Sequence, residues 1–473
     1  MSDGGPADQR LARDDTGATL RLRRPAAGPS GPIGTLLRWL WNHGFRLLFV
    51  LDAVGLYAVA LSINLFRFGL HWPRFRLYHY LVGFVIATTV QLLVNYFGGL
   101  YERQPRLGTP PWLPRVAGAM AIGVGIDSLI TLFSERYLMP RANLIAFFLL
   151  GCVVLMFNRA LSDRLAQIRR GPSRVLLVGK AGPIEVTAAH LRRGAGGRVT
   201  KVVGSVERTD ELLDAVVDTN PTDILLLDLA AFEPMFPEPL STLDDIGIGI
   251  HQRVGAHETL LGLRSVREIA GLPFTRIRTH SMSPHQEHLK RLFDLIVLLV
   301  CSPLILAVLG GLWLYVRIRA GRPVIYRQRR VGRDGSTFVL VKFRTMRPDA
   351  EAAGPQLSGK GDPRIIRGLS WMRTTRADEL PQVWNVLRGE MSLVGPRPER
   401  PELIEEIEPR VPGYGRRHSL VPGLTGLAQV QGRYDTPADD KLGYDLQYAV
   451  NWSLLLDIQI ILRTVWTVVT GRV

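Results

Sequence analysis

Cysteine is nearly absent from this 473-residue chain, which contains only Cys152 and Cys301. Both lie inside apolar runs, where a thiol packs as a small hydrophobic side chain. A chain with so few cysteines has no disulfide framework and no cysteine-rich zinc site. We therefore interpret both residues as packing residues.

Acidic residues are outnumbered by basic ones, 42 against 58, which leaves a formal net charge of +16. Nucleic-acid binding is one explanation of such a charge. However, no basic helix with base-reading side chains is evident, and 47% of the residues are hydrophobic. The composition favours a basic membrane protein, and we expect no nucleic-acid partner.

The length predicts about two to four domains. Residues 1–32 are rich in Gly, Pro, Asp and Arg and have no apolar period. This composition predicts a disordered, basic tail in the cytosol. No early apolar run ends at a small-residue cleavage site, so we expect no signal peptide.

Long apolar runs follow the tail, and each is about long enough to cross the hydrocarbon core of a bilayer. They predict a bundle of four transmembrane helices over residues 33–170. Arginines flank both ends, which places both ends in the cytoplasm, although Arg67, Arg74 and Arg76 then face outward. Asp127, inside the third run, either marks a substrate path or makes a hydrogen bond within the bundle. The runs are Phe45–Phe66, Tyr80–Leu100, Val116–Phe133 and Leu144–Leu161.

From Ser173 onward, short β-branched runs alternate with helical segments. This alternation predicts a parallel α/β domain of Rossmann type over residues 171–280. The turn Gly179-Lys-Ala-Gly182 lacks the third glycine of a dinucleotide fingerprint. A bound nicotinamide is therefore not favoured, and an oxidoreductase would also need a Tyr-x-x-x-Lys pair, which is not evident.

Two adjacent acids, Asp378 and Glu379, open a segment whose apolar residues recur at near-helical spacing. Thr375 has the spacing of a capping box, with Asp in place of the usual Glu or Gln. Acids in a first helical turn complement the macrodipole and need no chemical role. Their surroundings favour one nevertheless, because cations gather around this pair in loops shaped by Gly and Pro. These cations are Lys342, Arg344, Arg364, Arg373, Arg376 and Arg397.

Fixed arginines and exposed N–H groups at a helix start suit phosphate oxygens. A carboxylate that the same cations keep ionised can attack phosphorus and form a covalent intermediate. The second acid can hold Mg²⁺, because magnesium prefers oxygen ligands. The segment therefore predicts phosphoryl transfer served by two acids.

Several motifs follow one another in the last two-fifths of the chain, from about residue 285. They are Lys290-Arg291 with Asp294, Gln328-Arg329-Arg330-Val-Gly332, Lys342-Phe-Arg-Thr-Met346, Asp378-Glu-Leu-Pro-Gln382, Trp384-Asn-Val-Leu387, Met391-Ser-Leu-Val-Gly-Pro-Arg-Pro398 and Pro422-Gly-Leu-Thr-Gly426. In this order they resemble the monotopic phosphoglycosyl transferases, the bacterial initiating sugar-phosphate transferases. The resemblance implies transfer of a hexose-1-phosphate from a UDP-sugar to undecaprenyl (polyprenyl) phosphate, with release of UMP.

The same resemblance implies a covalent aspartyl-phosphosugar intermediate, with Asp378 as the nucleophile. It assigns Glu379 to Mg²⁺ binding or to activation of the lipid phosphate, and both acids are expected to contact the metal. Where the family usually has Ser-Leu before the acid pair, this chain has Arg376-Ala377. Substrate contacts are expected from Lys290, Arg291, Lys342, Arg344, Asp362, Arg364, Arg373, Arg397, Glu399 and Arg433.

The apolar run Leu292–Ile318 is long enough for a fifth span. Pro303 should bend this helix, and a full crossing would place the acid pair outside the cell, away from the UDP-sugar. The resemblance implies instead a re-entrant helix over residues 288–318, broken at Ser302-Pro303. Lys290 and Arg291 would then lie at the headgroups, where they bind lipid phosphate or serve as ordinary anchors. The segment Leu454–Val469 is predicted to be an interfacial amphipathic helix.

The expected fold class is a membrane α-helical bundle of four transmembrane helices, a Rossmann-like α/β domain, and an α-rich catalytic domain over residues 281–473. The long form of the family has this order. We expect a homodimer in the bacterial inner membrane, in contact with membrane lipids, with its catalytic domain in the cytoplasm. It would serve the first membrane step of exopolysaccharide, capsule or O-antigen synthesis. The alternatives are a transporter or flippase, which would carry ionisable residues near the midplane, and a scaffold of a polysaccharide assembly complex.

Overall fold

The computed structural model describes residues 12–13, 20–21, 44–70, 72, 77–102, 107–108, 111–133, 141–193, 200–255, 266–277, 282–350, 362–432 and 436–470. The chain divides into two compact units, Met1–Ile277 and Arg278–Val473. Within the predicted tail, Ala12–Arg13 (β1) and Leu20–Arg21 (β2) pair antiparallel, which the sequence did not predict. The rest of residues 1–32 lies outside the described part.

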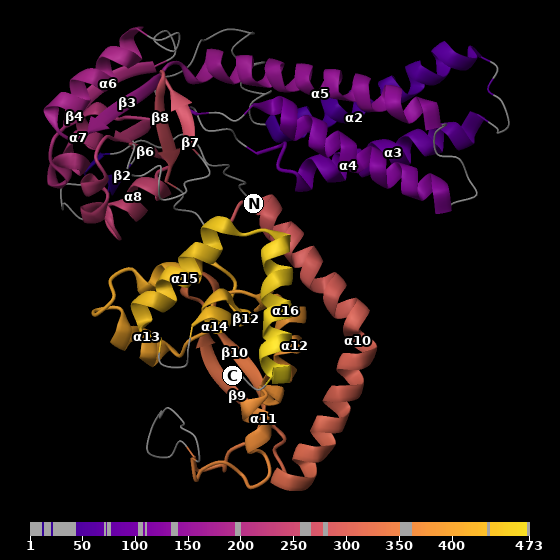
Figure 1. The fold of residues 1–473 in the computed structure, drawn as a ribbon, viewed down its shortest axis with the longest axis vertical. Helices are drawn as coiled ribbons and strands as arrows, with labels where there is room; N and C mark the ends of the chain where they lie inside the picture. The colour runs from indigo at the N-terminus through magenta and orange to yellow at the C-terminus, as the bar shows by residue number, and fades with distance from the viewer. Residues whose placement is uncertain are drawn as a thin grey trace. The chain divides into compact units, whose positions relative to one another are not determined.

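Four long helices follow in the first unit (Figure 1), and each overlaps one of the predicted apolar runs. All four are long and apolar enough to cross a membrane, and only 28–39% of their most apolar windows is buried inside the protein. Exposed apolar surface of this kind is what a lipid environment accommodates. The helices are α2 (Gly44–Phe68), α3 (Leu77–Phe97), α4 (Trp112–Phe133) and α5 (Arg141–Arg170).

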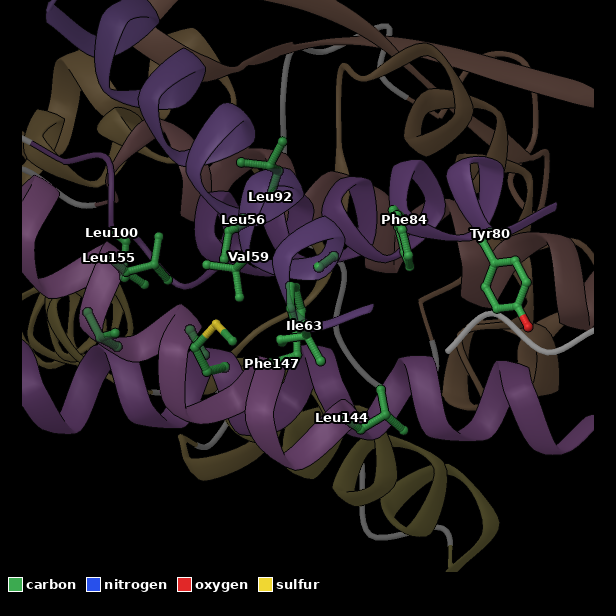
Figure 2. Close-up of a cluster of buried hydrophobic side chains, with 14 residues drawn as sticks. Leu56, Val59, Ile63, Tyr80, Phe84, Leu92, Leu100, Leu144, Phe147 and Leu155 are labelled. Atoms are coloured by element: carbon green, nitrogen blue, oxygen red, sulfur yellow. The ribbon is translucent and has the colours of Figure 1, made fainter. Parts of the chain in front are cut away.

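Side chains from all four helices meet in one apolar core, part of which Figure 2 shows around Leu56, Phe84 and Phe147. One charged pair is also fully buried in this unit. Arg159 donates from Nη1 to Oδ1 of Asp52 at 2.9 Å and from Nη2 to Oδ2 at 2.8 Å. A buried charge of this kind needs such a partner, because water cannot reach it.

The hydrogen bond expected of Asp127 within the bundle is not found. Asp127 is fully buried, and no group among the described residues is hydrogen-bonded to its carboxylate. The amide of Gln91 is engaged elsewhere, because its Nε2 donates to Asn95 Oδ1 at 2.9 Å and to the carbonyl of Ala119 at 3.2 Å.

An α/β region completes the first unit, with a six-stranded sheet in the order β4-β3-β5-β6-β8-β7. The first four strands are parallel, and β7 and β8 form an antiparallel hairpin against β6. Its elements are β3 (Ser173–Val178), α6 (Ala181–Arg193), β4 (Thr200–Val206), α7 (Leu212–Thr219), β5 (Asp223–Leu226), α8 (Leu240–Asp245), β6 (Gly249–Arg253), β7 (Val266–Ile269) and β8 (Leu272–Arg276).

Alternate side chains of β3 enter two different apolar clusters. Leu176 and Val178 belong to one cluster, and Val175 and Leu177 belong to the other. Successive side chains of a strand point to opposite faces of the sheet. Both faces are therefore covered, as is usual for parallel strands, which read as continuous apolar runs.

The second unit contains the acid pair and the motifs that follow one another from about residue 285. Its elements are α10 (Pro284–Ala320), β9 (Ile325–Val331), η5 (Arg333–Gly335), β10 (Thr337–Phe343), α11 (Ser370–Thr374), η6 (Ala377–Gln382), α12 (Val383–Arg388), β11 (Ser392–Val394), α13 (Pro401–Ile407), η7 (Tyr414–Ser419), β12 (Gly423–Thr425), α14 (Leu427–Gln431), α15 (Ala438–Asn451) and α16 (Leu454–Thr470). Strands β9 and β10 form an antiparallel hairpin, and β11 and β12 pair parallel.

Helix α10 is continuous over 37 residues, including Pro303, so the expected break at Ser302-Pro303 is not found. Figure 1 shows the helix as a bowed rod. A proline inside a helix removes one backbone hydrogen bond and bends the helix without having to end it. Only 11% of its most apolar window is buried, and α10 is the fifth described helix with the length and composition of a membrane span.

Close backbone contact between β11 and β12 requires glycine. A Cβ atom at Gly423 would lie 2.0 Å from the amide nitrogen of Gly395, and one at Gly395 would lie 2.4 Å from the carbonyl oxygen of Val421. Neither position tolerates a side chain unless the backbone moves. These contacts hold in place the loop that follows β11 and carries Arg397.

Candidate active site

The acid pair lies on the short 3₁₀ helix η6, between α11 and α12. The capping box predicted from Thr375 is wrong, because its hydroxyl donates backward to the carbonyl of Trp371 at 2.8 Å. Arg376 takes the N-cap position instead, with a left-handed backbone (φ 57°, ψ 20°). That reversal turns the chain so that the next residues enter the site.

The single helix expected after the acids is divided in two. Pro381 lies within the 3₁₀ turn, and the α-helix begins only at Val383. Proline has no N–H to donate, which favours a boundary at this point. Asn385 then fixes α12 to the β9–β10 hairpin, since its Nδ2 donates to the carbonyl of Val339 at 2.8 Å and its Oδ1 accepts from the amide of Val341 at 3.2 Å.

Two cations hold the carboxylate of Glu379, which is only 7% exposed. Arg397 donates from Nη2 to Oε1 at 2.9 Å and from Nη1 to Oε2 at 3.5 Å, and Lys342 Nζ lies 3.9 Å from Oε1. Burial opposes ionisation of Glu379, but Arg397 and Lys342 outweigh it and lower its pKa to about 2. This acid is therefore ionised throughout the physiological range.

Asp378 has the opposite electrostatic setting. It is 6% exposed, and no side chain of the described residues donates a hydrogen bond to its carboxylate. Burial, followed by the neighbouring charge of Glu379, raises its pKa to about 6. A buried carboxylate that no described side chain holds by a hydrogen bond is available to a substrate, and a carboxylate with a raised pKa is, once ionised, a better nucleophile than an ordinary aspartate.

Three further arginines contribute positive charge around the pair. Arg330 and Arg376 interact electrostatically with Glu379, and Arg373 does so with Asp378. Burial lowers the pKa of Arg330 to about 10. The alternation of side chains along β9 could have identified Arg330 from the sequence, because Arg330 and Gln328 share one face of this strand.

Arg344, expected at phosphate, is used elsewhere. Its Nη2 donates to the carbonyl oxygens of Ala320 and Arg322, and it is only 7% exposed. Asp362 and Arg364 pair with each other, Nη2 to Oδ2 at 2.6 Å, and the arginine lowers the pKa of Asp362 to about 2. The structure does not bring these side chains to the acid pair.

Lys290 and Arg291 are also engaged inside the unit. Lys290 Nζ donates to Asp457 Oδ2 at 2.8 Å, in a buried site where Tyr448 donates to the other oxygen of Asp457 at 2.7 Å. Arg291 donates to the carbonyls of Val386 and Leu387 at the C-terminal end of α12. Basic side chains commonly satisfy the last carbonyls of a helix. Arg433 lies outside the described residues.

A network of charged side chains lies behind the acid pair. Of its members, only Glu399 was predicted from the sequence as a site residue. Arg417 lies 2.7 Å from Asp445 and 3.8 Å from Glu399, which in turn lies 3.9 Å from Arg330. Arg417 Nη2 also donates to the carbonyl oxygen of Arg397 at 3.1 Å. The network thus fixes the backbone of the residue that holds Glu379.

The acid pair fits magnesium only in part. Sites that bind nucleotide phosphates usually hold Mg²⁺ through one or two carboxylates, with the remaining ligands from phosphates and water. No side chain of the described residues donates a hydrogen bond to Asp378, whereas both oxygens of Glu379 accept from Arg397. The described residues contain no group of three or more His, Cys, Asp or Glu that could hold a metal. A metal here would therefore depend on oxygens of the substrate.

The family profile described as bacterial sugar transferase matches residues 285–471, which include every element of this site from β9 to α15. A Bacillus subtilis protein named uncharacterized sugar transferase EpsL is 39% identical over 187 residues, covering 39% of this chain and 89% of that protein. A Caulobacter vibrioides UDP-glucose:undecaprenyl-phosphate glucose-1-phosphate transferase is 37% identical over 186 residues, covering 38% of this chain and 70% of that protein.

The chain belongs to the bacterial sugar transferase family. An Aeromonas hydrophila relative, named UDP-N-acetylgalactosamine-undecaprenyl-phosphate N-acetylgalactosaminephosphotransferase, is 37% identical over 192 residues. The match covers 40% of this chain and 45% of that relative, so the chain spans less than half of that relative's length. The likeness to the family therefore lies in the second unit.

Proposed function

We propose that this protein transfers a hexose-1-phosphate from a UDP-sugar to polyprenyl phosphate, and that Asp378 is the nucleophile. An oxygen of the Asp378 carboxylate attacks the phosphorus attached to the sugar, and the bond from that phosphorus to UMP breaks. UMP leaves with the bonding electrons. A phosphate oxygen of the polyprenyl phosphate then attacks the same phosphorus, and the bond to Asp378 breaks, which regenerates the carboxylate.

The observation that carries this proposal is the contrast between the two adjacent acids. Glu379 is held ionised by Arg397 and Lys342, whereas Asp378 is buried and no described side chain donates a hydrogen bond to it. Positive charges already in place stabilise negative charge that accumulates on phosphate oxygens during transfer. The names of the relatives, which include glucose and N-acetylgalactosamine phosphotransferases, support the class of donor and acceptor.

Asp378 and Glu379 are the residues that would hold Mg²⁺, and the ion would neutralise charge on the phosphates of the donor. Lys342, Arg397, Arg376 and Arg330 orient the diphosphate beside Asp378. The burial of the pair keeps water from competing with the lipid phosphate.

The membrane placement belongs to the same proposal. Helices α2 to α5 cross the bilayer as four spans, and α10 enters and leaves the cytoplasmic leaflet, which keeps the acid pair beside cytosolic UDP-sugar. Its bowed course and its exposed apolar surface support this placement. The α/β region is a Rossmann-like domain, and we expect the chain to form a homodimer in the inner membrane.

The experiment is UMP release from a panel of UDP-sugars by the purified protein with polyprenyl phosphate. Asp378→Asn should reduce the rate by at least about 10³-fold, because a nucleophile is lost. Asp127→Asn, in the bundle, should retain most of the rate. Incubation with donor alone should also yield an Asp378 peptide that is heavier by one sugar phosphate. Full UMP release by the Asp378→Asn variant would refute the nucleophile.

A further inference from the structure

A second basic site lies at the C-terminal end of α10. A cleft of about 580 Å³ is formed there by the last turns of the helix and the beginning of β9. It is lined by Trp313, Arg317, Arg322, Pro323, Val324, Ile325 and Arg327. Three cations thus share one concave surface with an aromatic ring.

The backbone under this cleft is fixed by a buried side chain. Arg344 donates to the carbonyls of Ala320 and Arg322, and its own amide donates to the carbonyl of Val324 at 2.8 Å. Val324 is buried in an apolar cluster with Val316 and Phe343. The connection between α10 and β9 is therefore held rigidly, and its arginines extend from a defined surface.

Among the described residues, no acidic side chain pairs with Arg317, Arg322 or Arg327. Basic residues in a last helical turn complement the macrodipole, which accounts for Arg317. It does not account for Arg322 and Arg327, because both follow the end of the helix. Three uncompensated guanidinium groups around one cleft suit an anion with several oxygens.

The cleft is separate from the acid pair. Lys342, which contacts Glu379, pairs across the hairpin with Tyr326, whereas Arg327 pairs with Val341. Cross-strand partners share a face, and neighbouring residues point to opposite faces. Arg327 therefore lies on the face of the hairpin opposite Lys342, and an anion bound by it does not occupy the catalytic site.

The apolar side of the cleft continues into the exposed surface of α10. Trp313 is 49% exposed, and Leu314 and Ile318 in the same turns of α10 are also exposed. Trp313 lies about 15 Å along the helix from Pro303, at 1.5 Å per residue. Tryptophan is enriched where hydrocarbon meets headgroups, and arginine reaches from there to phosphate. A ligand with both acyl chains and a phosphate matches this combination of surfaces.

We propose that this cleft binds the phosphate headgroup of an anionic phospholipid, with its acyl chains along α10. The site is distinct from the one that takes the donor and the polyprenyl phosphate. The inference rests on the membrane placement of α10 that we proposed above. One lipid bound in this way holds the carboxyl end of α10 at the level of the headgroups.

Lipid retention by the full-length protein tests the site. Native mass spectrometry in detergent, with added phosphatidylglycerol or phosphatidylcholine, should detect one tightly bound phosphatidylglycerol per chain and no comparable phosphatidylcholine. Arg322→Gln should weaken this binding about fivefold, as expected for loss of one cation near an anionic lipid. The triple variant Arg317→Gln, Arg322→Gln, Arg327→Gln should weaken it by about 100-fold on the same scale.

Arg329→Gln is the matched control, because Arg329 is an exposed arginine of the same strand that does not line the cleft. It should leave lipid retention unchanged. Wild-type retention by the triple variant would overturn the proposal, and so would an equal loss in Arg329→Gln and Arg322→Gln. Displacement of the lipid by millimolar inorganic phosphate would assign the site to free phosphate and overturn the lipid assignment.

UMP release from the same panel of UDP-sugars, measured on the same preparations, keeps the two proposals apart. The cleft arginines have no place in the catalytic machinery, so each variant should release UMP at close to the wild-type rate. A wild-type protein that binds phosphatidylglycerol but releases no UMP would contradict the proposed function and leave the lipid site standing.

Discussion

Two neighbouring carboxyl groups in this protein have pKa values that move in opposite directions. Burial and the charge of Glu379 raise the pKa of Asp378 to about 6. Glu379 is just as buried, but Arg397 and Lys342 lower its pKa to about 2. Environments that separate the pKa values of adjacent acids commonly separate their roles. Here Glu379 is the ionised acid held by two cations, and Asp378 is the acid that we propose as the nucleophile.

The pH dependence of UMP release follows from these values. Asp378 must be ionised to attack, so kcat/KM for the UDP-sugar should rise with pH through about 6. Burial lowers the pKa of Lys342 to about 8, so its positive charge, and the rate with it, should be lost above that pH. A bell-shaped profile for kcat/KM reports ionisations of the free enzyme. A rate that stays constant from pH 5 to pH 9 would contradict these assignments.

Lys342→Arg separates the two limbs of this profile. Arginine stays protonated far above the pKa of lysine. The alkaline limb should therefore move upward by at least about one pH unit, while the acid limb near Asp378 stays in place. Movement of both limbs together would mean that Lys342 does not carry the alkaline ionisation.

At the scale of single residues, the charged groups could be predicted from the sequence, but not all of their partners. Asp378, Lys342 and Arg397 were predicted from the crowding of cations around one acid pair, and the structure brings them together. Arg344 and Lys290 have the same kind of side chain, yet they bind backbone carbonyls and Asp457 instead. Nothing local distinguishes the two groups, because their partners are distant in sequence.

Among the elements, η7 and α15 hold the loop of Arg397 through Arg417. Arg417→Gln would leave Asp445 buried without its cation, which typically costs about 3–5 kcal/mol of stability. It would also remove the donor to the Arg397 carbonyl, so we expect slower UMP release together with a lower Tm. Both can be measured on one purified preparation.

Arg410→Gln is the control for that variant. Arg410 pairs with Glu406 on an exposed surface. Such pairs contribute about 0.5 kcal/mol, so its Tm and rate should stay close to wild type. Equal effects of the two substitutions would mean that the buried network has no special role.

The contact between β11 and β12 yields a second prediction at this scale. Gly423→Ala would place a methyl group against the Gly395 backbone, and we expect a loss of about 3 kcal/mol, at the upper end for overpacking. Gly443→Ala should act in the opposite direction. It lies within α15 with open space around it, so alanine should add about 0.8 kcal/mol through its helix propensity. Thermal unfolding of both variants checks the pair of signs.

Elements were predicted well where a long pattern specified them. The apolar runs located α2 to α5 and α10, because burial in lipid leaves a long and uniform signal. The sequence pattern predicts a regular helix at the acid pair, where the structure has a 3₁₀ turn. The left-handed backbone of Arg376, which precedes this turn, has no signature in the sequence. Pro303 was expected to interrupt α10, but the helix is continuous there, because a proline can bend a helix without ending it.

For the whole molecule, the family match and the site both lie in the second compact unit. That unit has its own apolar core, and a unit of this kind can fold alone. A fragment of residues 278–473 in lipid nanodiscs should therefore release UMP at a rate within about tenfold of the full chain. A folded but inactive fragment would show that residues 1–277 supply part of the active site.

The order of an apolar bundle, an α/β region and a catalytic region was visible in the sequence, because each has its own hydrophobic period. The role of the first unit was not, since the turn Gly179-Lys-Ala-Gly182 has too few glycines to indicate a ligand. Its buried Asp52–Arg159 pair could not be predicted either, because the two residues lie on α2 and α5, far apart in the chain.

The contacts of α10 within the second unit link the depth proposed for this helix in the bilayer to the position of the acid pair. Lys290 donates a hydrogen bond to Asp457 on α16, and Asp294 accepts one from Ser392 on β11 at 2.6 Å. The amino-terminal part of α10 is therefore joined to α16 and to the strand that leads into the Arg397 loop. We expect α10, α16 and β11 to move together. In the membrane placement proposed above, a change in leaflet thickness that displaces α10 would also displace Asp378, and it would change how far the polyprenyl phosphate has to extend from the membrane to reach that carboxylate.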